Sequence, residues 1–173
     1  MFREPIARAN SMYNFFVREN HNLRWIDERA YAQRTAGSAV LMLAGQRYGL
    51  ECLMQRAPCS PVQPNTMLAL KRLDTEFAYV GLTDEWALSI CLFHAKFGGA
   101  CLAHEFLNTH PTNSTHPTKS TALGRPLGDF VDRDDNMLFS RAAERFWNDV
   151  HEYNVTSEHC ARTICPAAAS HFI

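Results

Sequence analysis

A short apolar run followed at once by an amphipathic helix is the feature that most limits the folds open to this chain. Residues 77–82, FAYVGL, are apolar and β-prone, and residues 83–99, TDEWALSICLFHAKFGG, begin with Thr and acids and end with two glycines. Thr83 is expected to be the N-cap, acids stabilise a helix N-terminus, and glycine commonly ends a helix. The pattern predicts a strand, a turn and a helix in direct succession.

The apolar positions of this helix fall on one face. Trp86, Ile90, Phe93 and Phe97 recur at helical spacing, so the helix is predicted to pack against a sheet. Strands followed directly by helices favour an α/β layer fold with a mostly parallel sheet. In such sheets ligands bind at the carboxyl ends of the strands.

Helical periodicity predicts further helices, and composition predicts two loops. The helices are expected over about residues 5–19, within 27–48, and over 66–75 and about 135–153. The loops are rich in Pro or in polar residues and cover 52–64 and 107–129.

Charge and hydropathy exclude some classes of partner. The chain has 173 residues, 46% of them hydrophobic, with 17 Lys and Arg against 18 Asp and Glu. This length suits one domain, and the balanced charge recruits the chain neither to nucleic acid nor to a membrane surface. No apolar run approaches the roughly 20 residues of a membrane span. Any anion site must therefore be local.

Cysteine spacing favours an oxidising compartment. Cys52 with Cys59 and Cys160 with Cys165 are close in sequence and are predicted disulfides. Free thiols are the alternative, which suits Cys91 in its helical apolar pattern. Two Asn-x-Ser/Thr sequons also favour the secretory-pathway lumen, at Asn113 and Asn154.

Histidine and cysteine patterns do not predict a metal site. Cys101 and His104 are separated by two residues, a spacing seen in metal sites. Their spacing to the other histidines and cysteines, however, fits no closed tetrahedral pattern. Those others are His110, His116, His159, Cys160, Cys165 and His171. His94, on a helix of core residues, is predicted to be a buried, hydrogen-bonded histidine rather than a catalytic base.

The N-terminal segment FREPIARANSMYNFF, residues 2–16, carries the strongest candidate for anion binding. Arg3 offers a planar fork of donors that matches a phosphate, and Ser11 offers a hydroxyl from the following helix. The alternative is an ordinary amphipathic helix whose arginine side chains are solvated.

Three segments together resemble one family. REPIARANSMY, from Arg3 to Tyr13, resembles the Arg-Asp-Pro-x-x-Arg-x-x-Ser-x-Tyr segment of sulfotransferases that use 3′-phosphoadenosine 5′-phosphosulfate (PAPS), with Glu4 in place of Asp. FAYVGLTDEWALSICLFH and NMLFSRAAERFWNDVHEYN are similar, in the same order, to segments of the Golgi carbohydrate sulfotransferases, the heparan sulfate and uronyl 2-O-sulfotransferases among them.

The resemblance implies a fold, a co-substrate and two site residues. It implies an α/β, P-loop-NTPase-like sulfotransferase fold, helix-rich, with an incomplete parallel sheet, in a single partial domain over residues 1–173. Arg3 and Ser11 would bind the 3′-phosphate of PAPS, and no metal is implied. The acceptor would be a carbohydrate hydroxyl in the Golgi, and Lys119 and Arg125 in the polar loop are further candidates.

One departure from the family limits what this chain can do. The Gly/Ser/Thr-rich loop that holds the 5′-phosphosulfate is missing, and the catalytic base is expected upstream of Met1, as is any membrane anchor. We expect a fragment of a full-length enzyme, with a degenerate paralogue or a chain completed by a partner as alternatives. The competing function is a catalytically inactive remnant that binds a nucleotide or a partner; a truncated P-loop kinase is a third reading.

Overall fold

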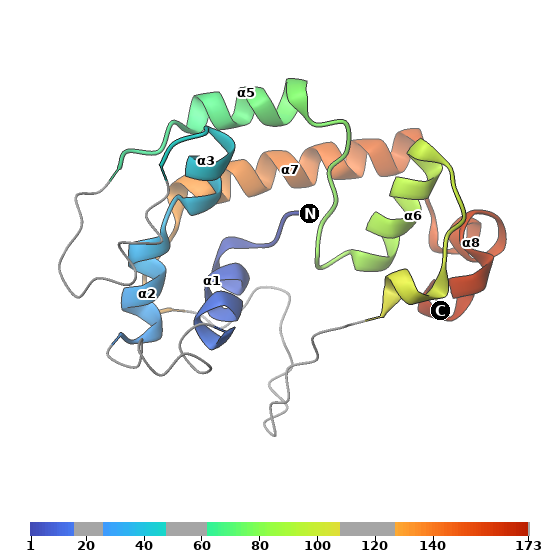
Figure 1. Ribbon diagram of the computed structural model, residues 1–173, viewed down its shortest axis with the longest axis horizontal. Coiled ribbons are helices and arrows are strands. Elements are labelled where there is room, and N and C mark those ends of the chain that lie inside the picture. The colour runs from blue at the N-terminus through green and yellow to red at the C-terminus, as the bar shows by residue number, and fades with distance from the viewer. Residues whose placement is uncertain (16–25, 48–61, 108–126, 173) are drawn as a thin grey trace. The chain divides into compact units, whose positions relative to one another are not determined.

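The computed structural model describes residues 1–15, 26–47, 62–107 and 127–172, and these form two compact units (Figure 1). Unit 1 combines Met1–Phe2, Ala78–Thr118 and Ala142–Ile173, and unit 2 combines Arg3–Phe77 and Lys119–Arg141. None of the helices in the described ranges is long and apolar enough to cross a membrane.

The predicted α/β fold with an incomplete parallel sheet is wrong for the part of the chain that the structure describes. Those residues contain helices and no strand, and their only β-type pairing is one parallel bridge between Phe2 and Leu82. In that bridge Phe2 N donates to Gly81 O at 2.7 Å, and Thr83 N donates to Phe2 O at 2.8 Å. One bridge is too short to make a strand, so residues 77–82 do not belong to a sheet.

Unit 2 is built from short helices and the beginning of a long one. These are α1 (Pro5–Tyr13), α2 (Glu28–Thr35), α3 (Ser38–Leu43), α5 (Thr66–Glu76) and the first part of α7 (Arg133–Glu152). The helices predicted over 66–75 and 135–153 are confirmed, and the helix predicted over 5–19 is confirmed as far as Tyr13. The predicted loop over 52–64 lies mostly outside the described residues.

Small apolar side chains hold unit 2 together. Ala9 of α1 and Ala32 of α2 pack with Leu127, and all three are buried. Tyr31, only 1% exposed, packs edge-on against Tyr13. Helix α5 lies along the first part of α7, because Thr66 donates to Asp134 near one end and Arg141 pairs with Asp74 near the other (Figure 1).

Unit 1 contains α6 (Trp86–Phe97), η3 (Ala103–Phe106), the second part of α7, and three short helical segments at the C-terminal end. Those segments, which the sequence did not predict, are α8 (Ser157–His159), η4 (Cys160–Ile164) and η5 (Pro166–Phe172). Helix α6 ends as predicted, since Gly98 and Gly99 have φ of 74° and 90°. Thr83 is not its N-cap, because α6 begins at Trp86 after Glu85.

The apolar face of α6 does not pack against a sheet as predicted. Trp86, Phe93 and Phe97 are 41, 43 and 52% exposed, whereas Cys91 and Leu92 are fully buried. The buried face therefore belongs to smaller side chains. The aromatic rings pack on one another instead, with Tyr79 edge-on to Phe93 at 5.5 Å between centroids.

Two disulfide bonds join distant segments of unit 1. Cys91 of α6 bonds to Cys160, and Cys101 bonds to Cys165. The predicted Cys160–Cys165 pair is wrong, and so is the free thiol at Cys91. Cys160 is the first residue of the one-turn π-helix η4, and Cys165 follows its last residue. Cys165 N donates to Cys160 O across this turn, and each of the two sulfurs is bonded to a different segment. Cys52 and Cys59 lie outside the described residues.

Candidate functional site

The N-terminal segment of unit 2 places Arg3 just before α1 and Ser11 on it. The Arg3 side chain is partly buried, and its Nε has no hydrogen-bond partner among the described residues. Ser11 is exposed. The structure records no contact between these two residues, so their common role remains a prediction.

Glu4 occupies the place that an anion would take at the N-terminus of α1. As the N-cap residue, its carboxylate accepts from Ile6 N at 3.0 Å and from Ala7 N at 2.6 Å. The first free N–H groups of the helix are therefore satisfied from within the chain. An anion near Arg3 would have to be bound by side chains rather than by the helix terminus.

Arg8, the second arginine of this segment, is held by two carboxylates. Its guanidinium pairs with Asp135, which is 1% exposed at the side chain, and lies 3.8 Å from Asp132. Asp135 also accepts from Ala39 N at 3.2 Å and Val40 N at 2.9 Å, and so caps the start of α3 from a distant part of the chain. This cluster joins three helices, and its role is structural.

Asp132 completes the cluster at the start of α7. Both of its oxygens lie 3.1 Å from Gly37 N, and Oδ1 also accepts from Asp135 N. Burial, together with the nearby charge of Asp135, raises the pKa of Asp132 to about 6. Gly37 has φ of 70°, and a side chain there would meet Pro64, so glycine is needed at this contact.

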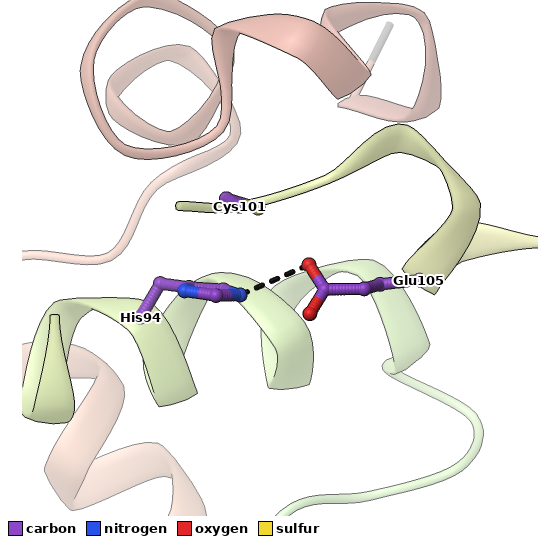
Figure 2. A group of neighbouring side chains, drawn as sticks. All are labelled: His94, Cys101 and Glu105. Atoms are coloured by element: carbon purple, nitrogen blue, oxygen red, sulfur yellow. Dashed lines mark hydrogen bonds and ion pairs between the residues drawn. The ribbon is translucent and has the colours of Figure 1, made fainter. Parts of the chain in front are cut away.

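A histidine, a carboxylate and a sulfur converge in unit 1 (Figure 2). His94 lies in the last turn of α6, Cys101 on the extended segment that follows, and Glu105 on η3. Their potential ligand atoms all lie within 4.8 Å of one another, and this is the one such group found among the described residues. Figure 2 shows the imidazole and the carboxylate pointing toward each other with Cys101 alongside.

Both ring nitrogens of His94 face oxygen atoms. Nδ1 lies 3.2 Å from the carbonyl oxygen of Gly98, and Nε2 lies 3.0 Å from Glu105 Oε2. A carbonyl only accepts, so Nδ1 carries a proton and donates to Gly98. The prediction that His94 is a buried, hydrogen-bonded histidine is confirmed, since the residue is 8% exposed.

Glu105 is fixed by a backbone hydrogen bond as well as by His94. Its Oε2 accepts from Leu102 N at 2.8 Å. That hydrogen bond, and the neighbouring His94, lower the pKa of Glu105 from its usual value. Glu105 was not predicted as a site residue, because the sequence spacing pairs Cys101 with His104, whose side chain is exposed. The signal available was a glutamate three residues after Leu102, the spacing of a side chain that caps a helical turn.

Cys101 cannot serve as a metal ligand in the oxidised chain. Its sulfur is bonded to Cys165, and a disulfide sulfur has no thiolate lone pair of the kind that binds zinc. In this state the three groups form a hydrogen-bonded pair beside a disulfide. Of the other candidates from the sequence, Lys119, Arg125, His110, His116 and Asn113 lie outside the described residues. His159 and His171 are described and are not part of the cluster.

Unit 2 also has a shallow groove between α5 and α7. Its volume is about 740 Å³, and Met67, Leu70 and Met137 form its apolar surface, with Lys71 and Arg141 at its edge. Two of the residues that line this groove, Arg141 and Asp74, form an ordinary surface ion pair. It holds no cluster of catalytic groups among its lining residues.

Comparisons with known proteins add no further assignment. No protein-family model matches the chain, and neither the curated proteins nor the solved structures searched gave a match. The functional argument therefore rests on the residues themselves.

Proposed function

We propose that the chain binds the 3′-phosphate of PAPS or of adenosine 3′,5′-bisphosphate through Arg3 and Ser11, as the nucleotide-binding part of a sulfotransferase. The observation that carries the proposal is the state of Arg3. Its Nε is buried without a hydrogen-bond partner among the described residues. Buried polar groups are nearly always paired, so an unpaired guanidinium N–H favours an anionic ligand.

Three other arginines of unit 2 differ from Arg3 in this respect. Arg8 pairs with Asp135, Arg29 with Asp129, and Arg141 with Asp74. An anion that approached any of them would compete with a carboxylate already in place. Arg3 has no such competitor in an ion pair that the structure records, and a guanidinium matches the oxygens of a phosphate geometrically.

The reaction that such an enzyme would catalyse is transfer of the sulfuryl group to a hydroxyl of a carbohydrate. That reaction needs a base to accept the hydroxyl proton and a cation to stabilise the charge that develops on the leaving phosphate oxygen. We assign neither group in this chain. The alternative function is that of an inactive remnant, which would bind the nucleotide and transfer nothing.

Isothermal titration calorimetry tests the nucleotide proposal. The chain should bind adenosine 3′,5′-bisphosphate more tightly than adenosine 5′-monophosphate, which lacks the 3′-phosphate. Arg3→Ala should weaken the first affinity by about 10- to 100-fold, since a hydrogen bond to a charged group contributes about 1.5–3 kcal/mol. Arg162→Ala is the matched control, because Arg162 is exposed and paired only with Glu158 four residues earlier.

Two results would separate the alternatives. Equal affinity for the two nucleotides, or no effect of Arg3→Ala, would refute the assignment of the 3′-phosphate. Binding without transfer of a labelled sulfuryl group from PAPS to a panel of glycans would favour the inactive remnant.

A further inference from the structure

The His94, Cys101 and Glu105 side chains have the composition of a zinc site in which one ligand is blocked. A nitrogen, a sulfur and a carboxylate oxygen lie within 4.8 Å of one another, and Cys101 and His94 are both 8% exposed (Figure 2). Imidazole, thiolate and carboxylate are the three ligand types that zinc takes in proteins. Only the disulfide of Cys101 with Cys165 prevents the set from being complete.

We propose that reduction of the Cys101–Cys165 disulfide creates a zinc site formed by His94 Nε2, the Cys101 thiolate and a Glu105 carboxylate oxygen. The oxidised chain would not bind zinc there. The site lies within unit 1 and does not depend on the nucleotide-binding proposal for Arg3.

The hydrogen bonds around the cluster already orient its groups for a metal. His94 Nδ1 donates to the carbonyl oxygen of Gly98, which leaves Nε2 as the nitrogen that faces Glu105. Metal-binding histidines usually donate their second N–H to a carbonyl or a carboxylate in this way, which fixes the tautomer and the ring. Leu102 N in turn holds Glu105 Oε2.

The distances require small movements. With metal bonds of 2.0–2.3 Å at tetrahedral angles, the ligand atoms of a zinc site lie about 3.3–3.6 Å apart. His94 Nε2 and Glu105 Oε2 are 3.0 Å apart, and no pair in the group exceeds 4.8 Å. The imidazole and the carboxylate thus need to separate by a few tenths of an ångström to admit the ion, and the sulfur to approach by about 1 Å at most. Three protein ligands leave the fourth tetrahedral position to water.

The chemistry balances with a dithiol as reductant. The dithiol gives two electrons and two protons to the Cys101–Cys165 bond, so two cysteine thiols form and the dithiol closes to its own disulfide. Zinc then displaces the proton of the Cys101 thiol and any proton on His94 Nε2, and these pass to solvent. Exchange with an oxidised dithiol, which takes up the two electrons and two protons, would restore the Cys101–Cys165 bond and expel the ion, because Cys101 would lose its thiolate.

A matched pair of variants tests the proposal without any reductant. Cys165→Ala and Cys101→Ala both lose the same disulfide and keep all other cysteines, but only Cys165→Ala keeps the Cys101 thiol. Cys165→Ala should bind one Zn²⁺ per chain in competition with a chromophoric chelator. Its affinity should exceed that of Cys101→Ala by at least about 100-fold, the upper range for loss of a supporting group. Co²⁺ should give Cys165→Ala the charge-transfer absorption of a cobalt–thiolate bond.

Further variants in the Cys165→Ala background identify the other ligands. His94→Gln and Glu105→Gln should abolish the tight zinc binding, and His104→Ala should leave it unchanged, because His104 is exposed beside Glu105 and outside the cluster. Equal zinc affinity in Cys165→Ala and Cys101→Ala would overturn the proposal. Unchanged affinity after either glutamine substitution would do the same.

Circular dichroism would check that the variants fold. A second measurement, on the wild-type chain, does not depend on their folding. Native mass spectrometry should find one zinc ion on the chain reduced with a dithiol and none on the oxidised chain. The reduced Glu105→Gln chain should hold no zinc. A reduced wild-type chain that binds no zinc, or an oxidised chain that binds as much as the reduced one, would refute the inference.

Discussion

The two disulfide bonds of unit 1 should stabilise the fold by amounts that are not additive. Cys91–Cys160 and Cys101–Cys165 span 69 and 64 residues of sequence. Taken alone, closing a loop of either length should stabilise the native state by about 4.4 kcal/mol through the lost entropy of the unfolded chain. The two loops overlap along most of their length, however, so each bond shortens the loop that the other has to close.

The size of this coupling follows from the positions of the cysteines. When Cys91–Cys160 is intact, the path from Cys101 to Cys165 runs back ten residues to Cys91, across the bond, and on five residues from Cys160. A loop of about 15 residues corresponds to about 3 kcal/mol. Removing either bond by a Cys→Ala pair should therefore cost about 3 kcal/mol, and removing both should cost about 7.5 kcal/mol, the value for one long loop plus one short loop.

Urea unfolding followed by circular dichroism measures these losses. The fourfold variant should lose about 1.5 kcal/mol more than the two double variants together. Since domains are commonly stable by about 5–15 kcal/mol, the fourfold variant should keep at most about half of its stability, and its urea midpoint should fall accordingly. The reasoning would be refuted if each double variant lost less than about 1 kcal/mol, or if the fourfold variant were no less stable than either double variant.

Two further predictions concern buried polar groups. Asp132 has a pKa raised from 3.8 to about 6, so its contribution to stability is full below about pH 4 and is lost as the pH rises through 6. Between about pH 4 and pH 7 the free energy of unfolding should fall by about 3 kcal/mol for this reason. The Asp132→Asn variant should lack this fall when its stability to urea is measured at several pH values. The same pH profile in the variant and the wild type would contradict the assignment. Ser89 is fully buried, and its Oγ both accepts from Leu82 N and donates to Leu82 O at 2.9 Å. Ser89→Ala should therefore cost about 2 kcal/mol in thermal or urea unfolding, and a cost near zero would show that another partner replaces the hydroxyl.

The helices of this protein could be predicted from its sequence, because their signals are local. Asn65 caps α5 by accepting from Leu68 N, and Gly98 ends α6 with a positive φ, both within a few residues of the helix concerned. Apolar periodicity marked α7 in the same way. The short helices after Val155 were missed because Pro166 and two cysteines interrupt any 3.6-residue pattern there.

The sheet was predicted wrongly because the pattern of a strand does not supply its partner. Residues 77–82 have β-prone side chains, but the described part of the chain gives them one bridge, at Leu82. The Ser89 side chain satisfies part of this backbone instead, because its hydroxyl accepts from Leu82 N and donates to Leu82 O at 2.9 Å. Strand pairing is a long-range property, and a single sequence contains little information about it.

The pairing of the cysteines was equally beyond local reasoning. Short spacing suggested Cys160 with Cys165, whereas the structure joins each of them to a cysteine more than 60 residues earlier. Proximity in sequence is a weak guide, because a disulfide depends on the positions of Cα atoms in the folded chain. The same bond ties Cys165 to Cys101 of the His94, Cys101 and Glu105 cluster.

The two arginines of the REPIAR segment differ in whether an anion could bind to them. Arg8 pairs with Asp135, 127 residues away, and a phosphate could reach it only by breaking a contact that also caps α3. The backbone N–H groups at the start of α1 are taken by Glu4. Arg3 has a buried donor without a partner among the described residues and no recorded ion pair, so a 3′-phosphate could gain affinity through it without first displacing a carboxylate. A nucleotide that bound equally well without Arg3 would leave this segment with a purely structural role.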